Sequence, residues 1–271
     1  MVTLPIGLQL CSVQENAIAD FEGTLRRVKA MGYDGVEFAG LYGQEPAGIK
    51  RMCQEIGLVP VSAHVGFMDL LKDPRGVISI YKEISCMQVV IPGLTEDYLP
   101  GGPRFQEAAE GIRILGEVCR ELGMELAYHN HDFEFVKIND EYLLDIFYKE
   151  IPDTLLKTQL DTCWVNTGGV DPAAYVRKYA GRMPTLHLKD FTGSRSVHLC
   201  TLTENDGKEV QKQEDTFEFR PVGYGKQDFP AILEAACSSG VSWLIVEQDE
   251  PGMGKTRMEC AGMSIEYLRS L

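Results

Sequence analysis

The sequence predicts a single (β/α)8 barrel of the α/β class. Three observations lead to this prediction: the length, a repeated helix–glycine–strand unit, and the polar residues that end the strands. The chain has 271 residues, an ordinary size for one such barrel. In five places an expected helix ends at a glycine, and an apolar run follows that is short enough for a strand buried on both faces. The five glycines are Gly32, Gly57, Gly123, Gly181 and Gly240.

Eight strands are expected to alternate with eight helices through one domain that spans residues 1–271. The strands are expected at 6–10, 35–37, 58–64, 87–91, 125–129, 155–160, 183–187 and 241–247. The helices are expected at about 20–31, 46–56, 74–84, 104–122, 140–150, 171–179, 228–239 and 255–270. Asp73-Pro74 and Asp171-Pro172 are typical helix starts, because aspartate caps the first turn and proline fits its first position. The alternative, an open doubly wound sheet, would have a G-x-G-x-x-G motif after the first strand, which this chain lacks.

The composition indicates a globular protein of a reducing compartment. Hydrophobic residues make up 44% of the chain and charged residues 24%. The net charge of −14 would repel a phosphate backbone, so we expect no nucleic-acid partner. We expect no membrane partner either, because no apolar run approaches the roughly 20 residues that span a bilayer, and no leader-like segment begins the chain. The eight cysteines form no C-x-x-C pair, so free thiols in the cytoplasm are expected. A homo-oligomer is compatible with this sequence.

The segment 191–227 has no helical period and follows the seventh strand, so we expect a lid-like insertion above the mouth of the barrel. Within it, 197–203 and 210–219 are expected to pair as a hairpin around Asp206-Gly207, a strong turn signal. Arg220 is the residue of the insertion that we expect to contact substrate. The glycine-rich run 221–225 predicts a tight turn, with a phosphate cradle as the alternative.

Polar residues end seven of the expected strands, and chemistry in a barrel enzyme takes place at these carboxyl ends. They are Gln9, Glu37, His64, His129, Asp161, His187 and Glu247. Because the last three strands are neighbours, Asp161, His187 and Glu247 are expected to converge on one divalent metal ion. Two carboxylates and an imidazole with open positions suit Mn²⁺, Mg²⁺ or Co²⁺ better than a closed zinc site. Mn²⁺ is the ion that we expect first, and Zn²⁺ is kept among the alternatives.

The run 128–135 is the densest polar cluster, and a fourth metal ligand is expected from it. His129 and His131 share one face of an extended segment, and Glu134 lies in the loop beyond. We expect Glu134 to be the fourth ligand and a catalytic carboxylate. Elsewhere, Trp164 is expected to stack on a sugar face, and Lys189 points the same way as His187 and is expected to bind an oxyanion.

Five stretches carry a family resemblance, at 6–13, 128–135, 160–165, 186–190 and 246–249. With them the chain resembles the xylose isomerase-like barrel superfamily, often labelled sugar phosphate isomerases/epimerases. Its motifs are most similar to those of inosose dehydratase relatives. The resemblance implies an Mn²⁺-type site of Glu, Asp, His and Glu, to which Asp161, His187 and Glu247 correspond. Tyr128 is expected at the position of the epimerase glutamate on the fifth strand, and Glu134 is the expected replacement.

The predicted function is that of a metal-dependent isomerase or epimerase that moves a proton next to the carbonyl of a sugar or sugar-derived ketone. Glu134 or Glu247 would remove the proton. The alternative is a dehydratase or lyase of a keto-sugar or keto-inositol, with His131 or His129 as the acid. In either case a small sugar-like substrate is expected to contact residues at the strand ends and in the insertion: Gln9, Glu37, His64, His129, Trp164 and Arg220.

Two further classes are compatible with a barrel of this kind. A nuclease related to endonuclease IV would need more metal-binding histidines and a basic face, whereas this chain has five histidines and a net charge of −14. A catalytically silent sugar-binding barrel would bind no metal ion and exchange no substrate protons with solvent.

Overall fold

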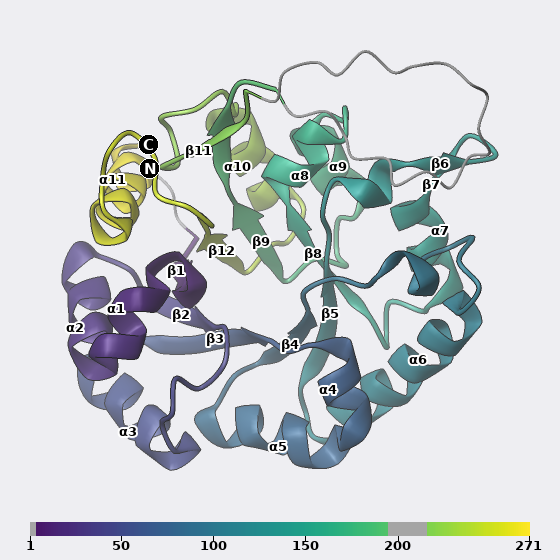
Figure 1. Cartoon of the computed structure of the whole chain (residues 1–271), viewed down its shortest axis with the longest axis horizontal. Coiled ribbons are helices and arrows are strands. Elements are labelled where there is room, and N and C mark those ends of the chain that lie inside the picture. The colour runs from purple at the N-terminus through teal and green to yellow at the C-terminus, as the bar shows by residue number, and fades with distance from the viewer. Residues whose placement is uncertain (1–3, 195–215) are drawn as a thin grey trace.

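The computed structural model describes residues 4–194 and 216–271, and in it eight parallel strands close into a barrel surrounded by helices (Figure 1). The order around the barrel is β1, β12, β9, β8, β5, β4, β3 and β2. The strands are β1 (Ile6–Gln9), β2 (Gly35–Phe38), β3 (Val59–His64), β4 (Gln88–Ile91), β5 (Glu125–His129), β8 (Lys157–Asp161), β9 (Thr185–Leu188) and β12 (Trp243–Val246). The predicted (β/α)8 barrel is confirmed.

The eight expected helices are all present. They are α2 (Phe21–Met31), α3 (Pro46–Ile56), α5 (Pro74–Ile84), α6 (Phe105–Glu121), α7 (Leu143–Glu150), α9 (Pro172–Lys178), α10 (Phe229–Ser238) and α11 (Arg257–Ser270). Asp73 begins α5 by accepting a hydrogen bond from the backbone N–H of Gly76, as its sequence predicts. α7 starts later than expected, because a small hairpin of β6 (Lys137–Ile138) and β7 (Glu141–Tyr142) precedes it. In the described part of the chain, no helix is long and apolar enough to cross a membrane.

Several short helices follow barrel strands and were not predicted from the sequence. They are η1 (Leu10–Val13), α1 (Gln14–Ala19), α4 (Phe67–Lys72), η2 (Glu96–Tyr98), η3 (Phe133–Phe135) and α8 (Thr162–Thr167). The start of α8 positions a carboxylate that was predicted for the site. Asp161 Oδ1 accepts hydrogen bonds from the backbone N–H groups of Cys163 and Trp164. This cap fixes one carboxylate oxygen of Asp161 and turns the other, Oδ2, toward other groups.

The barrel strands send alternate side chains outward to the helices and inward to the barrel axis. Leu160 and Leu186, on neighbouring strands, belong to the apolar core. The polar side chains along the axis are almost completely buried; they include Gln9, Glu37, Ser62, Gln88, Gln159 and Thr185. Because these groups hydrogen-bond to one another across the barrel, they form a polar floor under the strand ends.

The described part of the insertion begins and ends in a short antiparallel ladder. β10 (Asp190–Thr192) pairs with β11 (Glu218–Arg220), and Phe191 lies opposite Phe219. The predicted turn at 206–207 and the strand 197–203 lie outside the described residues, so the predicted hairpin is not tested. In the ladder that is described, the partner of Phe219 is Phe191, which comes before the expected first strand of the hairpin.

The glycine-rich run 221–225 forms a turn, and its backbone donors are already bound. The Asp190 carboxylate accepts hydrogen bonds from the N–H groups of Gly223 at 3.0 Å, Gly225 at 2.8 Å and Gln227 at 3.2 Å. These are the donors that a phosphate cradle would have needed. The predicted tight turn is therefore confirmed. The Asp190 carboxylate binds the backbone N–H groups that a phosphate would have bound in the alternative interpretation.

Candidate active site

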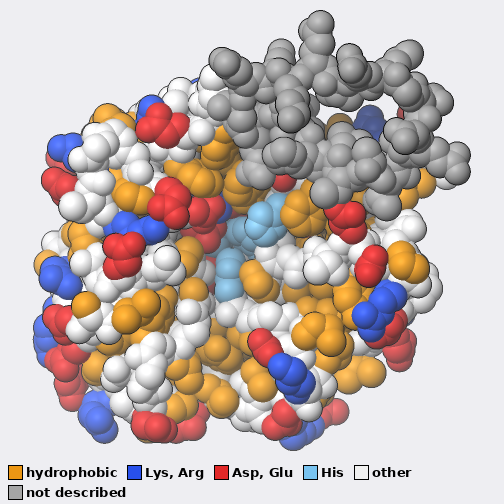
Figure 2. All heavy atoms as spheres, in the orientation of Figure 1, with side chains coloured by type: hydrophobic (Ala, Val, Ile, Leu, Met, Phe, Trp, Pro, Cys, Tyr) orange, Lys and Arg blue, Asp and Glu red, His pale blue; other side chains and the backbone are white. Residues whose placement is uncertain are grey.

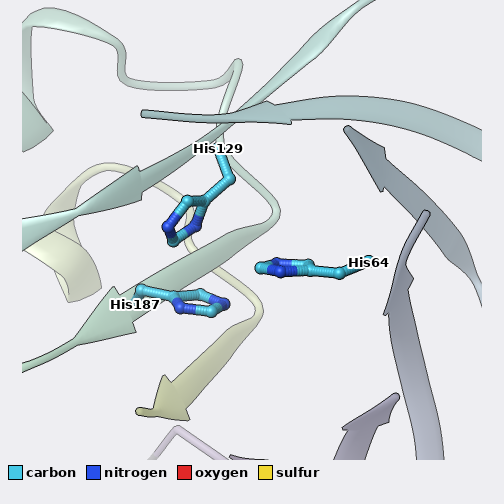
Figure 3. A group of neighbouring side chains, drawn as sticks. All are labelled: His64, His129 and His187. Atoms are coloured by element: carbon cyan, nitrogen blue, oxygen red, sulfur yellow. The ribbon is translucent and has the colours of Figure 1, made fainter. Parts of the chain in front are cut away.

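Three histidine side chains converge at the carboxyl ends of the barrel strands. His64 comes from β3, His129 from β5 and His187 from β9, and they point toward one another (Figure 3). The ring centroids of His129 and His187 are 4.6 Å apart, and the ring of His64 lies 4.9 Å from His129 and 5.3 Å from His187. Figure 2 shows histidine side chains at the bottom of a hollow in the middle of this face, with acidic side chains beside them. The strand ends therefore form a recessed polar site, as expected for a barrel enzyme.

Four buried side chains at these strand ends could hold one metal ion. His129, Asp161, His187 and Glu247 each offer one ligand atom, and these atoms all lie within 4.8 Å of one another. The structure thus brings together three of the four residues that were predicted as ligands. Asp161 Oδ2 accepts no hydrogen bond from the described residues, although it is buried and lies 3.1 Å from Lys189 Nζ. A buried carboxylate oxygen in this position, beside imidazole nitrogens, fits a divalent cation.

The fourth member of this group is His129, and the predicted Glu134 lies outside it. Alternation along β5 turns His129 inward and Tyr128 outward, where the Tyr128 ring packs 4.6 Å from the ring of Phe147. Glu134 follows Tyr128 outward: its Oε1 accepts a hydrogen bond from the Tyr128 hydroxyl at 2.6 Å, and its Oε2 accepts one from the backbone N–H of His131 at 2.8 Å. Burial raises the pKa of Glu134 to about 7, although these hydrogen bonds oppose the shift. Strand alternation was the sequence signal that could have selected His129.

Lys189 lies beside this group with its side chain 2% exposed. Its ammonium is 2.9 Å from Glu247 Oε2, 3.1 Å from Asp161 Oδ2 and 3.2 Å from Asp249 Oδ2. Burial alone would lower the pKa of Lys189, but the three carboxylates raise it well above its ordinary value. Lys189 is therefore a buried positive charge held by three carboxylates, and its binding of an oxyanion stays a prediction.

Two residues of the site were not predicted from the sequence. Asp249 contacts Lys189, and burial raises its pKa. Cys11 donates a hydrogen bond from Sγ to Glu247 Oε1 at 3.2 Å. Asp249 lies two residues after Glu247, and this spacing was the available signal for it; Cys11 comes from η1, and its sequence neighbours carry no such signal.

Glu37 and Gln9, which were expected to contact substrate, are fully buried in the polar floor under the histidines. Glu37 Oε1 accepts hydrogen bonds from Gln9 Nε2 and from His187 Nε2, each at 2.7 Å. Burial would raise the pKa of Glu37, but His64 and His187 bring it well below its ordinary value. His64, whose side chain is 11% exposed, is the member of this network that is open to the mouth.

The remaining predicted residues lie around this group. The ring centroid of Trp164 lies 5.7 Å from that of His131 and 5.9 Å from that of Phe217. Lys189 Nζ lies 5.0 Å from the Trp164 ring centroid. Arg220, in β11, forms an ion pair with Glu218 and donates a hydrogen bond to the backbone oxygen of Phe219. Trp164 is thus next to the site, whereas the hydrogen bonds and ion pairs that the Arg220 guanidinium makes with described residues are within its own strand.

Known proteins support this architecture. A family model described as a xylose isomerase-like TIM barrel matches residues 25–271. An inosose dehydratase of Geobacillus kaustophilus (strain HTA426) is 22% identical over 271 residues, which cover 91% of this chain and 86% of that protein. A crystal structure of a sugar phosphate isomerase/epimerase from Parabacteroides distasonis ATCC 8503 has a TM-score of 0.75 at 21% identity, covering 100% of this chain and 95% of that one.

A crystal structure of the IOLI protein with a bound zinc atom has a TM-score of 0.71 at 16% identity and covers 98% of this chain and 97% of that one. At these identities the solved structures show a shared fold, and the family match extends over most of the chain. With eight parallel strands closed into a barrel and a polar site at their carboxyl ends, the chain is an enzyme that belongs to the xylose isomerase-like TIM barrel family.

Proposed function

We propose that this enzyme is a divalent-metal-dependent dehydratase, or lyase, of a keto-sugar or keto-inositol. It would remove a proton from the carbon next to the ketone and release the β-hydroxyl as water. The observation that carries the proposal is the buried group of His129, Asp161, His187 and Glu247, with the Lys189 ammonium beside it. Curated relatives named inosose dehydratase, 22% to 26% identical, support the same chemistry.

The ligand set of this proposal is His129, Asp161, His187 and Glu247, and Mn²⁺ is the expected ion, with Mg²⁺, Co²⁺ and Zn²⁺ as alternatives. When bound, the ion would polarise the ketone and the neighbouring hydroxyl, which makes the adjacent C–H bond more acidic. His129 suits the role of a neutral ligand, because burial and the nearby His187 and His64 hold its pKa well below the ordinary value.

The enzyme's own side chains would perform the proton transfers. Glu247 remains a carboxylate, because Lys189 and His187 lower its pKa well below the ordinary value although burial opposes this. Because it is ionised, it is the proposed acceptor of the proton from carbon, although its low pKa makes it a weaker base than an ordinary glutamate. Lys189 can donate a hydrogen bond to the oxygen on which negative charge develops. His131 is the proposed acid that protonates the departing hydroxyl, so one C–H and one C–O bond break, a C=C bond forms and water leaves.

The substrate of the proposed reaction is uncharged. The carboxylates of Asp161, Glu247 and Asp249 surround Lys189, so this ammonium already has three anionic neighbours. Asp190 binds the backbone donors of the turn at 221–225 that could have held a phosphate. These two observations favour an uncharged sugar over a phosphorylated one.

An isomerase or epimerase is the second candidate, because both reactions begin with loss of the same proton. The solved structure titled sugar phosphate isomerase/epimerase supports it. Epimerisation needs a second group that returns the proton from the opposite side, and Glu134 was the expected one. Its carboxylate accepts hydrogen bonds from Tyr128 and the backbone of His131, and it lies outside the ligand group. This observation favours elimination.

The test is hydrogen exchange and elimination in D2O with the Mn²⁺-loaded protein and a panel of ketoses, inososes and 3-keto-glycosides. NMR reports deuterium gained at carbon, and ultraviolet absorption reports the conjugated ketone that elimination produces. We expect an inosose or another keto-polyol to exchange and to lose water. Exchange with return of a rearranged or epimeric ketose, without loss of water, would instead establish the isomerase. No bound metal and no exchange with any member would favour a sugar-binding barrel.

A further inference from the structure

We infer that Glu37 is a positioning residue that holds both histidine ligands of the proposed metal site, His187 directly and His129 through Gln159. The inference rests on the proposed function, because it concerns the ion that this function requires. It differs from the sequence-based expectation that Glu37 contacts substrate.

Glu37 lies on β2, with an exposed fraction of 0%, and the groups around its carboxylate are donors. Its Oε2 accepts hydrogen bonds from Ser62 Oγ at 2.6 Å and from Gln159 Nε2 at 2.7 Å. Its Oε1 accepts them from Gln9 Nε2 and His187 Nε2 at 2.7 Å each. Four donors match the roughly four lone-pair sites of a carboxylate, so Glu37 has no acceptor site left for a substrate hydroxyl.

The contact with Glu37 decides which nitrogen of His187 can bind a metal ion. Each ring nitrogen of His187 faces a carboxylate: Nε2 lies 2.7 Å from Glu37 Oε1, and Nδ1 lies 3.0 Å from Glu247 Oε2, on the side of the other proposed ligands. When an ion occupies the site, Nδ1 would have to release its proton to bind it, and Glu37 would hold the remaining proton on Nε2. Glu37 thus selects both the tautomer and the orientation of the ring, as carboxylates commonly do for metal-binding histidines.

Gln159 extends the same control to His129. Because Glu37 accepts, the amide nitrogen of Gln159 must face it, and this nitrogen also donates to Thr185 Oγ1 at 3.0 Å. The amide oxygen therefore points the other way, where it lies 2.8 Å from His64 Nε2 and accepts a hydrogen bond from His129 Nδ1 at 3.2 Å. His129 Nε2, which lies 3.7 Å from Asp161 Oδ2, is left as the ligand nitrogen. Reversal of the Gln159 amide would present N–H groups to His129 and disfavour this tautomer.

The experiment is a Co²⁺ titration of the metal-free, full-length protein and its variants, read by the visible d–d absorption of the bound ion. Glu37→Gln keeps the shape of the side chain but no longer forces the orientation of Gln159. Gln159→Leu removes the hydrogen bond to His129, together with those to His64 and Thr185, but leaves the direct contact of Glu37 with His187. We expect each variant to raise the Kd for Co²⁺ by about 10- to 100-fold and to shift the d–d bands. In the double variant, the fold-increase in Kd should be smaller than the product of the two single-variant increases, because Glu37 acts on His129 through Gln159.

The control is Asp145→Asn. Asp145 is also a buried carboxylate with several donors, Tyr175, Tyr179 and Lys178, but it lies on α7 away from the ligand group. We expect it to change the thermal midpoint and leave both the Kd and the spectrum of bound Co²⁺ unchanged. The two test variants alter opposite ends of the network, so either one decides the question if the other does not fold.

Three outcomes would overturn the inference. If the wild type binds one Co²⁺ and the folded variants bind it with the same Kd and spectrum, Glu37 does not position the histidines, while the proposed function stands. A raised KM with unchanged metal affinity in Glu37→Gln has the same meaning and would assign Glu37 to substrate. If the wild type itself binds no Co²⁺, the proposed function and this inference fail together.

Discussion

The ends of β8, β9 and β12 differ from the end of β5, although the sequence places polar residues at all four. The first three strands deliver Asp161, His187 and Glu247 to one group of ligand atoms. The end of β5 sends His129 into this group, and the loop after it directs Glu134 to Tyr128 on the other side of the strand. A carboxylate near a site is therefore not sufficient to make a ligand, because local donors can bind it first.

The difference has a structural reason. Asp161 uses one oxygen for the start of α8, and its Oδ2 faces the site, whereas the oxygens of Glu134 accept hydrogen bonds from Tyr128 on β5 and from the backbone of His131 in its own loop. Substitutions at these residues test whether Asp161 binds metal and Glu134 does not.

The largest effect on metal binding is expected from substitution of the proposed ligands at the ends of β8, β9 and β12. Asp161→Asn or His187→Ala should abolish tight metal binding and activity, because each removes a ligand; the Kd should rise well beyond the roughly 10- to 100-fold typical of an indirect partner. Metal content by mass spectrometry and a Mn²⁺ titration measure this. Full metal content in Asp161→Asn would mean that the site lies elsewhere.

The acid role of His131 can be separated from the metal site. His131→Gln should reduce elimination by about 10²- to 10⁴-fold, the usual contribution of a general acid, while exchange of the α-hydrogen with D2O continues. Both rates are measured on one substrate by NMR. If exchange and turnover fall together, His131 acts in binding or in an isomerase reaction; if neither changes, it has a structural role.

His129 at the end of β5 and Glu134 in the loop after it can be compared directly as candidates for the fourth ligand. His129→Ala should raise the Kd for Mn²⁺ by at least about 100-fold, whereas Glu134→Gln should still bind one ion per chain with nearly the wild-type Kd. Isothermal titration of the two variants provides the measurement. The reverse result would restore Glu134 as the fourth ligand.

The burial of Glu134 should also make the free energy of unfolding depend on pH. Its pKa is raised from 4.5 to about 7 by burial, so the folded protein holds this proton more tightly than the unfolded chain does. As pH rises between these two values, this contribution to the free energy of unfolding is lost, by about 3 kcal/mol in total. Denaturant unfolding of wild type and Glu134→Gln from pH 4.5 to 8 measures it. The wild-type advantage should shrink with pH, and parallel curves would contradict the shift.

The smallest effect is expected at Arg220. Its guanidinium pairs with Glu218, which is 54% exposed, and surface pairs of this kind contribute little. We expect Arg220→Ala to lower kcat/KM on the true substrate less than about threefold. A larger loss would support the sequence-based expectation that Arg220 contacts substrate, and Glu218→Ala is the matched control for loss of the ion pair.

The barrel and the face that carries the proposed metal ligands could be predicted from the sequence alone. The runs after Gly32 and Gly57 are too short for helices and too apolar for exposed strands, so they predict parallel strands that are buried on both faces. Once the strands are parallel and adjacent, their carboxyl ends meet, so the convergence of Asp161, His187 and Glu247 follows from the order of the strands.

Only the tertiary structure decided how the side chains pair. Glu37 and Glu134 are both glutamates near a strand end, yet one is bound by donors from four other strands and the other by its own loop. Nothing in the neighbouring residues of Glu37 indicates that His187, 150 positions away, donates to it. The period of a strand sets the face on which a side chain lies, but the partner of a buried charge is set by the donors that the closed barrel brings within hydrogen-bonding distance.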